Sequence, residues 1–376
     1  MRDAFDQVSG LIVAYNAEDT IVRALQSAKS QVRNLIFVDD GSKDNTLSLV
    51  RAHWPEATII CHVKNQGIGA ARQSAIQACR TEFACWLDSD DEWLPGRVER
   101  LRHFIHCGAD YVFDEAELYD QSESTKICDL KIPNFLLDDD GLVFQLGRNY
   151  IPSIGWPMVR TSVAKSVGYD CYLPQAEDYD HFLKAFKSGY QISLLSGPSG
   201  VRQYCSSGSA SRNIGSQNKH VARVLSRLDI NYVFDRVVES RISDFDKLLV
   251  FSMFLTRTSN WVKLHDFLMD YQATVFDGYQ KAVYHFLIGV CLIRVSEKKK
   301  AVAAFRASLN AYELPESWNN LGVLLRCLGE NSTRCFENAL SLFPEYLDAL
   351  KNFQHQDIVV TEVPLRLEAY RSKYWN

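Results

Sequence analysis

The first part of the chain alternates between short apolar runs and amphipathic stretches. The apolar runs are rich in β-branched residues and predict strands at Val8–Val13, Leu35–Val38, Ala57–Val63 and Phe83–Leu87. Helical patterns separate them, and the first repeats small or apolar residues at Ile21, Ala24, Leu25 and Ala28. Strands that alternate with helices at this spacing predict βαβ units and a mostly parallel sheet.

The pattern is less regular from about residue 110 to residue 215. Strands are predicted at Tyr111–Phe113, Gly155–Arg160 and Gln191–Leu195, and an amphipathic helix at Tyr179–Ser188. The segment Ser196–Ser216 is rich in Ser and Gly and predicts a loop. Residues 205–216 of this loop are a hypothetical lid over a bound ligand.

Beyond about residue 217 the strand patterns end and helical periodicity takes over. Gly289 and Gly322 lie 33 residues apart in similar surroundings, and Trp318-Asn319-Asn320-Leu321-Gly322 resembles part of the tetratricopeptide repeat. We therefore expect an all-α domain over 216–376, with tetratricopeptide-like repeats over about 281–355. A plain helical bundle is the alternative. Stacked helix pairs would offer a surface for a protein partner or for self-association.

Composition narrows the class of protein. Hydrophobic residues make up 47% and charged residues 23% of the 376 residues, which is typical of globular domains, and the net charge is −5. This balance disfavours general nucleic-acid binding and a polybasic membrane anchor. The ten cysteines include no Cys-x-x-Cys pair, and we expect neither a signal peptide nor a transmembrane segment. These features predict a cytoplasmic protein with reduced thiols, either free or peripheral at the inner face of a membrane.

Acidic clusters follow two of the predicted strands. Asp39-Asp40-Gly41-Ser42 follows one, and Asp88-Ser89-Asp90-Asp91 follows the other. Such residues also form ordinary turns, which is the alternative reading of each cluster alone. Two clusters at one edge of a sheet place like charges together, and a divalent cation is the simplest compensation. Oxygen ligands suit Mg²⁺ or Mn²⁺, which commonly bind phosphates as well, so we expect a diphosphate ligand.

A glycine-containing segment supports this expectation. A predicted helix opens with the segment Asn65-Gln66-Gly67-Ile68-Gly69-Ala70-Ala71-Arg72. The glycines of this segment allow the backbone to approach a ligand closely. Arg72 can present its guanidinium to a phosphate or to one of the acids. The segment lacks the third glycine of the dinucleotide-binding fingerprint.

Four segments together resemble the nucleotide-binding half of a family 2 glycosyltransferase with the GT-A fold. They are Val13–Thr20, Val38–Ser42, Asn65–Arg72 and Leu87–Pro95, in the order that the family shows. The resemblance continues more loosely to about residue 212. It therefore implies a GT-A catalytic domain, an α/β sheet with flanking helices, over 1–215.

The resemblance implies a role for each matching residue. Tyr15 would lie against the base of the donor, Asp40 would bond the edge of a uracil, and Asp39 would support Asp40. Arg72, Asp88 and Ser89 would help to hold the nucleotide sugar. Asp88 and Asp90 form an Asp-x-Asp motif for Mn²⁺ or Mg²⁺, with Asp90 the more direct ligand. The metal would neutralise charge on the departing UDP.

Ala176-Glu177-Asp178-Tyr179-Asp180-His181-Phe182 resembles the family's Glu-Asp motif at a helix start. The resemblance implies that Asp178 is the general base of a single, inverting displacement. The alternative is that these acids only cap a helix. A histidine that many relatives carry after the next strand is replaced here by Tyr204, and His220 is a second candidate for its place.

The sequence thus favours a metal-dependent, inverting glycosyltransferase that uses a nucleotide sugar, most simply a UDP-sugar, and a glycan or protein acceptor. An inactive GT-A domain within an interaction scaffold is the alternative. A nucleotidyltransferase is disfavoured, because the first strand is followed by Ala14–Ala17 and not by a glycine-rich loop that could grip a triphosphate. Trp156 could stack on an acceptor sugar or only pack in the core.

Overall fold

The computed structural model describes residues 7–105, 108–122, 124–151, 156–205, 214–271, 276–344, 346–354 and 357–360. The chain separates into two compact units, Met1–Arg227 and Leu228–Asn376. The boundary expected from the sequence, at 215/216, falls at the start of α8 (Ile214–Leu225). Helix α8 contacts α7 (Glu177–Lys187) and therefore belongs to the first unit.

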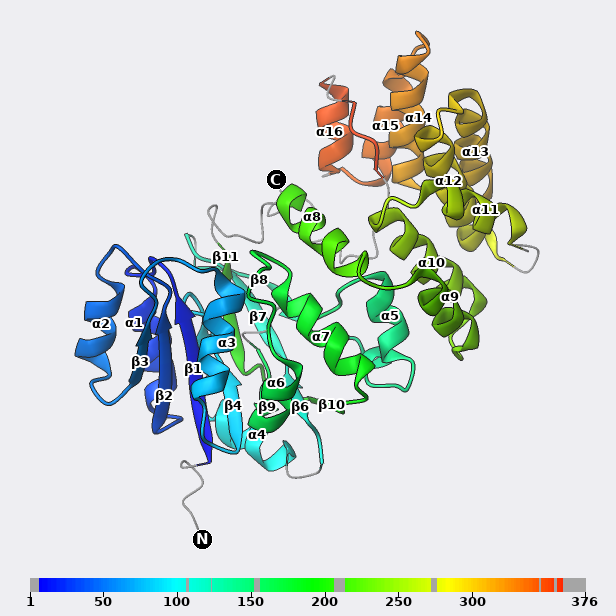
Figure 1. Cartoon of the computed structure of the whole chain (residues 1–376). Helices are drawn as coiled ribbons and strands as arrows, with labels where there is room; N and C mark the ends of the chain where they lie inside the picture. Colours follow the sequence, from blue (N-terminus) through cyan, green and yellow to red (C-terminus); the bar gives the residue numbers. More distant parts are fainter. Residues whose placement is uncertain are drawn as a thin grey trace. The chain divides into compact units, whose positions relative to one another are not determined.

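The first unit is the α/β unit (Figure 1). Besides α7 and α8, its elements are β1 (Val8–Ala14), α1 (Ile21–Lys29), β2 (Asn34–Asp39), α2 (Thr46–His53), β3 (Thr58–Cys61), α3 (Ile68–Ala78), β4 (Phe83–Trp86), β5 (Glu92–Trp93), α4 (Arg97–Ile105), β6 (Tyr111–Asp114), β7 (Ala116–Asp120), β8 (Lys126–Leu130), η2 (Asn134–Leu136), α5 (Gly141–Gly147), β9 (Met158–Arg160), α6 (Thr161–Val167), β10 (Ile192–Leu195) and β11 (Val201–Cys205).

The larger sheet has the strand order β10-β6-β9-β4-β1-β2-β3. β1 pairs in parallel with both β2 and β4, whereas β9 is antiparallel to its two neighbours. The chain runs outward from β1 to β3 and returns to β4 on the other side of β1. In open α/β sheets, ligands bind beyond the carboxyl ends of the strands at such a reversal. The residues that follow β1, β2 and β4 therefore lie where a site is expected.

Burial explains why these segments fold as they do. β1 is buried along its whole length, as expected of a strand covered on both faces. Helix α1 buries the face predicted from its spacing, namely Ile21, Ala24, Leu25 and Ala28. A Cβ on Gly69 of α3 would lie 2.3 Å from the carbonyl oxygen of Asp170. Glycine at 69 therefore allows α3 to pack tightly on the segment that precedes α7.

A smaller sheet, in the order β5-β11-β7-β8, was not predicted from the sequence. β11 is antiparallel to β5 and parallel to β7. β5 has two residues and β8 lacks a continuous apolar run, so neither shows a strand pattern in the sequence. The pairing of β5 with β11 brings residues 201–205 beside the chain that follows β4.

The second unit contains helices alone among its described residues. They are α9 (Ile230–Glu239), α10 (Asp244–Arg257), α11 (Trp261–Asp270), α12 (Gly278–Arg294), α13 (Lys298–Ala311), α14 (Pro315–Cys327), α15 (Thr333–Leu342) and α16 (Leu347–Phe353). A Cβ on Gly289 of α12 would lie 2.7 Å from the ring of Phe305, and one on Gly322 of α14 would lie 2.7 Å from the ring of Phe336. The same glycine–aromatic contact thus recurs in two helix pairs. It supports a repeat, whose tetratricopeptide class stays a prediction.

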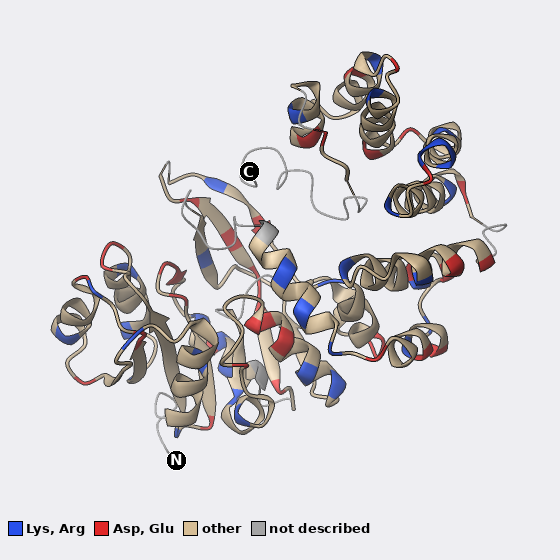
Figure 2. Ribbon diagram, turned by 45° about the horizontal axis from the view of Figure 1, so that its top comes forward, with Lys and Arg blue, Asp and Glu red and all other residues tan. Residues whose placement is uncertain are grey.

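Basic and acidic side chains are interspersed along both units (Figure 2). This distribution agrees with the small net charge of −5. Among the described residues, the helices are too short or too polar for any of them to cross a membrane.

Candidate active site

The loops after β1 and β2 brace one another. Asn16, at φ 51°, donates its N–H to Ser42 Oγ at 3.0 Å, and Asn16 Oδ1 accepts the N–H of Lys43 at 2.8 Å. Tyr15 lies between β1 and this braced residue, and 47% of its surface is exposed. An accessible ring on a fixed loop can stack on a flat ligand. Tyr15 therefore meets the geometric requirement for contact with a base.

Asp40 has a structural role that the sequence analysis missed. Asp39 and Asp40 are buried, with exposures of 4% and 3%. The N–H groups of Gln66 and Gly67 donate to the two oxygens of Asp40, each at 2.9 Å, and His62 Nδ1 lies 2.6 Å from Asp40 Oδ1. Asp40 thus anchors the loop that leads into α3. Its bond to a uracil stays a prediction.

The acidic loop, Asp88–Asp91, follows β4. Asp91 is 4% exposed, and its Oδ1 accepts the N–H of Tyr204 at 2.9 Å. Burial, together with Asp90 and Asp88, raises the pKa of Asp91 well above its usual value. Burial and the charge of Asp88 raise the pKa of Asp90 to about 6. The neighbouring carboxylates thus disfavour the charged forms of Asp90 and Asp91, and Ser89 lies partly exposed in the same loop.

Arg23 and Tyr204 contact the acidic loop from two other elements. Arg23 donates to the carbonyl oxygen of Asp90, and its guanidinium lies 3.6 Å from the centroid of the Tyr204 ring. The Tyr204 hydroxyl donates to Glu92 Oε1 at 3.1 Å. Tyr204 therefore stands beside the acidic loop, at the position where the resemblance implied a histidine. Arg23 was missed because no local pattern marks it; the packing of α1 on β5 brings it here.

Arg72 joins the acidic loop to the start of α7. Its side chain is 4% exposed and lies 2.9 Å from Asp88 Oδ1 and 3.0 Å from Glu177 Oε1. Burial lowers the pKa of Arg72, but Asp88 and Glu177 more than offset this effect, so the pKa is raised. The sequence predicted a partner among the phosphates or the acids, and in this structure the partners are acids. The pairing of Glu177 with Arg72 was not predicted from the sequence.

Asp178 lies in the first turn of α7, which begins two residues before the predicted start at Tyr179. The residue before the helix, Ala176, has the left-handed values φ 64° and ψ 20°, which are unusual for a residue with a Cβ. Asp178 Oδ1 accepts the N–H of Tyr179 at 2.7 Å. Burial, and then the charge of Glu177, raise the pKa of Asp178 to about 7. Such a carboxyl can accept a proton near neutral pH.

A buried histidine fixes the next turn of α7. Burial lowers the pKa of His181 to about 3, so the ring is neutral. His181 Nδ1 lies 2.8 Å from the carbonyl oxygen of Gly168, and Nε2 lies 2.8 Å from the hydroxyl of Tyr111. The ring also stacks on Tyr169 at 4.3 Å. Because Nδ1 donates and Nε2 accepts, the helix that carries Asp178 is held in one position.

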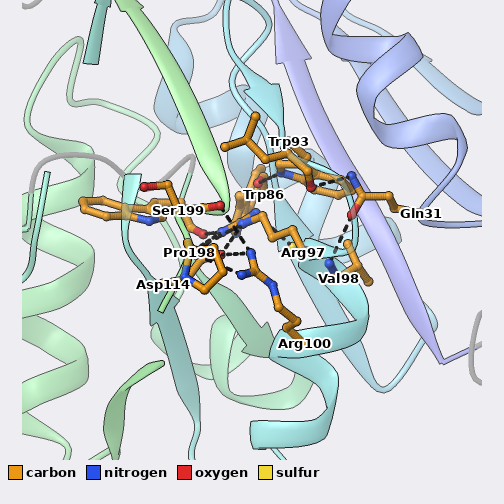
Figure 3. A network of polar contacts seen from close by, with 12 residues as sticks. Gln31, Trp86, Trp93, Arg97, Val98, Arg100, Asp114, Pro198 and Ser199 are labelled. Atoms are coloured by element: carbon orange, nitrogen blue, oxygen red, sulfur yellow. Dashed lines mark hydrogen bonds and ion pairs between the residues drawn. The ribbon is translucent and has the colours of Figure 1, made fainter. Parts of the chain in front are cut away.

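A buried ion pair supports the chain on both sides of the acidic loop (Figure 3). Arg97 is fully buried and donates to both oxygens of Asp114 at 3.0 Å and to the carbonyl oxygen of Trp156. Trp93 Nε1 donates to the carbonyl oxygen of Trp86 at 3.0 Å. These bonds tie β4, β5, α4 and β6 together. Trp156 is fully buried as well, so it packs in the core and is not accessible to a sugar.

His220 lies on α8, and its Nδ1 is buried without a hydrogen-bond partner. Residues 206–213, which make up most of the predicted lid, lie outside the described residues.

Within the described ranges, no three His, Cys, Asp or Glu side chains are close enough to one another to hold a metal ion. A cation at Asp88 and Asp90 would therefore take its other ligands from water or from a bound diphosphate.

Residues 9–143 match the family model described as glycosyl transferase family 2. Relatives include the succinoglycan biosynthesis protein ExoO of Rhizobium meliloti, which is 31% identical over 39% of this chain and 46% of that protein. Another is the UDP-Glc:alpha-D-GlcNAc-diphosphoundecaprenol beta-1,3-glucosyltransferase WfaP of Escherichia coli, 34% identical over 26% of this chain and 41% of that protein. The chain spans about half the length of the curated relatives that it matches.

Solved structures give a likeness of fold. The crystal structure of S. aureus TarS 1–349 in complex with UDP-GlcNAc matches with a TM-score of 0.50 and 15% identity, over 91% of this chain and 93% of that one. At this identity the match concerns the fold alone, and it agrees with a GT-A sheet and its flanking helices. Residues 9–143 thus match glycosyl transferase family 2, and the fold of the N-terminal unit agrees with the GT-A fold that the sequence resemblance implied.

Proposed function

We propose that this chain is a metal-dependent, inverting glycosyltransferase that moves a sugar from a UDP-sugar to a hydroxyl group. The observation that carries the proposal is the pairing of Arg72 with both Asp88 and Glu177. Through it, the acidic loop expected to hold the donor lies next to the turn that carries Asp178. A relative named for its use of UDP-Glc supports the uridine donor.

The donor would bind at the carboxyl ends of β1, β2 and β4. The exposed ring of Tyr15 would stack on the base, next to Asp39 and Asp40. Arg72 and Ser89 would approach the diphosphate and the sugar. Arg72 is paired with two acids, so a phosphate that contacts its guanidinium would compete with one of these pairs.

Asp88 and Asp90 would hold Mn²⁺ or Mg²⁺. Their chemistry fits a hard cation, because such ions prefer oxygen ligands and because a cation would offset the burial and the charge of Asp88 that raise the pKa of Asp90 to about 6. Such a cation supplies Lewis-acid neutralisation of the UDP leaving group.

Asp178 would act as the general base. Its carboxylate would take the proton from the acceptor hydroxyl as that oxygen attacks the anomeric carbon and the bond to UDP breaks. Burial of Asp178 and then the charge of Glu177 raise its pKa to about 7, close to the pH at which proton transfer is most effective. One displacement of this kind inverts the anomeric configuration and needs no covalent intermediate.

The acceptor would be a glycan or a protein. A relative named for succinoglycan biosynthesis supports a glycan. The helical unit would then bind the acceptor, a partner protein or a second copy of the chain, at a cytoplasmic location either free or at the inner face of a membrane.

A thermal-shift screen of UDP-, GDP- and dTDP-sugars, each with Mn²⁺, tests the donor and the metal together. We expect a UDP-sugar to raise the melting temperature only when Mn²⁺ is present, since a ligand stabilises the state that it binds. Asp90→Asn should abolish this shift, whereas Asp139→Asn, at an exposed turn, should retain it. If Asp90→Asn behaves like the control, the metal site is assigned wrongly. If no UDP-sugar shifts the wild type, the inactive scaffold becomes the better account.

A further inference from the structure

The second unit contains three buried asparagines that glycosyl transfer does not use. Asn319 and Asn320 lie on α14 and Asn352 lies on α16, and each is 0% exposed. A buried carboxamide is costly unless its N–H and C=O groups are hydrogen-bonded. Most of the hydrogen bonds of these side chains are made with the backbone of residues 357–360, called here the docked segment.

The bonds follow the alternation of an extended chain. Asn320 Nδ2 donates to the carbonyl of Val360 at 2.7 Å, and Asn320 Oδ1 accepts the N–H of Val360 at 2.8 Å. Asn352 pairs in the same two-fold way with Ile358, donating to its carbonyl at 2.7 Å and accepting its N–H. Asn319 Nδ2 adds a bond to the Ile358 carbonyl at 3.1 Å. Two carboxamides thus replace the neighbouring strand that the backbone of an extended segment would otherwise need.

The asparagines also support one another. Asn352 Nδ2 donates to Asn319 Oδ1 at 2.8 Å, and Asn319 Nδ2 lies 3.2 Å from Asn320 Oδ1. The three side chains therefore form one connected row that spans two helices. If the docked segment left, this row would lose its partners at Ile358 and Val360 and would have to be rehydrated or filled by another backbone.

Side chains add selection to this backbone recognition. Arg326 Nη1 lies 2.9 Å from Asp357 Oδ1, and its other nitrogen donates to the Asn352 carbonyl at 2.7 Å. Val360 is 8% exposed, and Ile358 is partly buried. The site thus accommodates an acidic residue, an aliphatic residue, an unspecified residue and a second aliphatic residue, in that order.

We propose that Asn319, Asn320, Asn352 and Arg326 form a binding site for an extended peptide, which the docked segment occupies in cis and which a partner segment of the acidic–aliphatic–x–aliphatic pattern can occupy in its place. Main-chain bonds supply most of the affinity, and the charge and the aliphatic positions supply the selection. A tethered occupant acts at an effective concentration of the order of millimolar, so the docked segment sets the affinity that a partner must exceed. This site is independent of the glycosyl transfer proposed above.

Fluorescence polarisation with the whole 376-residue chain tests the proposal. The probe is a labelled, end-capped peptide with the sequence of residues 354–363. The double variant Ile358→Pro/Val360→Pro lacks the two N–H groups that donate to Asn352 and Asn320. We therefore expect the docked segment to leave the asparagine row in this variant. Val359→Pro removes the intervening N–H and is the matched control. We expect the probe to bind the double variant at least about tenfold more tightly than it binds wild type or Val359→Pro, because the tethered competitor is gone.

Further variants separate backbone recognition from nonspecific adhesion. A probe N-methylated at the positions of residues 358 and 360 should lose binding to the double variant, and one methylated at the position of 359 should retain it. Asn320→Ala added to the double variant should also remove binding. If circular dichroism shows that the double variant is unfolded, Val360→Asp, which puts a charge at a buried position, takes its place. Equal affinity for wild type and a folded, released variant, or binding indifferent to N-methylation, overturns the proposal.

Discussion

Replacing Arg72 by methionine removes the guanidinium that links Asp88 of the acidic loop to Glu177 of α7. The side chain is 4% exposed, and its nitrogens lie 2.9 Å from Asp88 and 3.0 Å from Glu177. Loss of one member of a buried ion pair costs about 3–5 kcal/mol, because the remaining charge stays buried and unpaired. Asp88 is 24% exposed and can be partly rehydrated, so we expect the lower value, about 3 kcal/mol.

A double-mutant cycle measures how much of this cost comes from Glu177. Glu177→Gln alone should cost about 1–2 kcal/mol, since Arg72 keeps its bond to Asp88. With both replaced, neither the guanidinium nor the Glu177 charge remains, so the double variant should be about 1–2 kcal/mol more stable than the sum of the single effects implies.

The free energies of unfolding for this cycle come from urea unfolding of the α/β unit in the wild type, the two single variants and the double variant, measured without donor or metal. Additive effects within about 0.5 kcal/mol would show that Arg72 and Glu177 do not depend on one another, and the proposed link between the two halves of the site would fail.

Three further results are expected. Transfer by the wild type should decline as the pH falls through about 7, because burial and Glu177 raise the pKa of Asp178 to about 7 and the base must be ionised. In Glu177→Gln, a pH–rate profile should show this decline at a lower pH. A profile that does not move contradicts the assignment of Asp178 as the base. Asp40→Ala should lower the free energy of unfolding by about 1–3 kcal/mol in urea, because two N–H groups of the next loop lose their acceptor, and no loss means that Asp40 does not anchor that loop. Gly289→Ala should destabilise the helical unit by about 1–3 kcal/mol, because the new Cβ would lie 2.7 Å from the Phe305 ring. Adding Phe305→Leu to this variant should recover part of the lost stability in a thermal melt. If Gly289→Ala does not change the stability, the packing argument is wrong.

The sheet and the strand ends could be predicted from the sequence because their signals are local. β1 and β2 are short apolar runs that end in the polar residues of the site, and α1 buries the face set by its spacing. The placement of Asp39 and Asp88 at one edge then follows from the rule for parallel sheets. The small sheet could not be predicted, since β5 and β8 lack a strand pattern and are strands only through their partners.

The contacts of the site were less accessible to sequence reasoning, because they join residues far apart in the chain. Arg72 was singled out by its motif, yet nothing in the sequence indicated that Glu177 would be its partner. Arg23 reaches the acidic loop only because α1 packs against β5. The hydrogen bonds between Asn320 and Val360 also join residues far apart in the sequence. The repeat-like pattern around Asn320 did not indicate Val360 as its partner.

The proposed role of Asp178 is tested most directly by Asp178→Asn, in an assay that measures donor binding and UDP release on the same protein. We expect the variant to keep the Mn²⁺-dependent thermal shift produced by a UDP-sugar, because Asp178 is not among the proposed donor or metal ligands. It should lose acceptor-dependent release of UDP, by about 100-fold or more, since the base is absent. Release at the wild-type rate, with glycan acceptors that the wild type uses, would contradict the account.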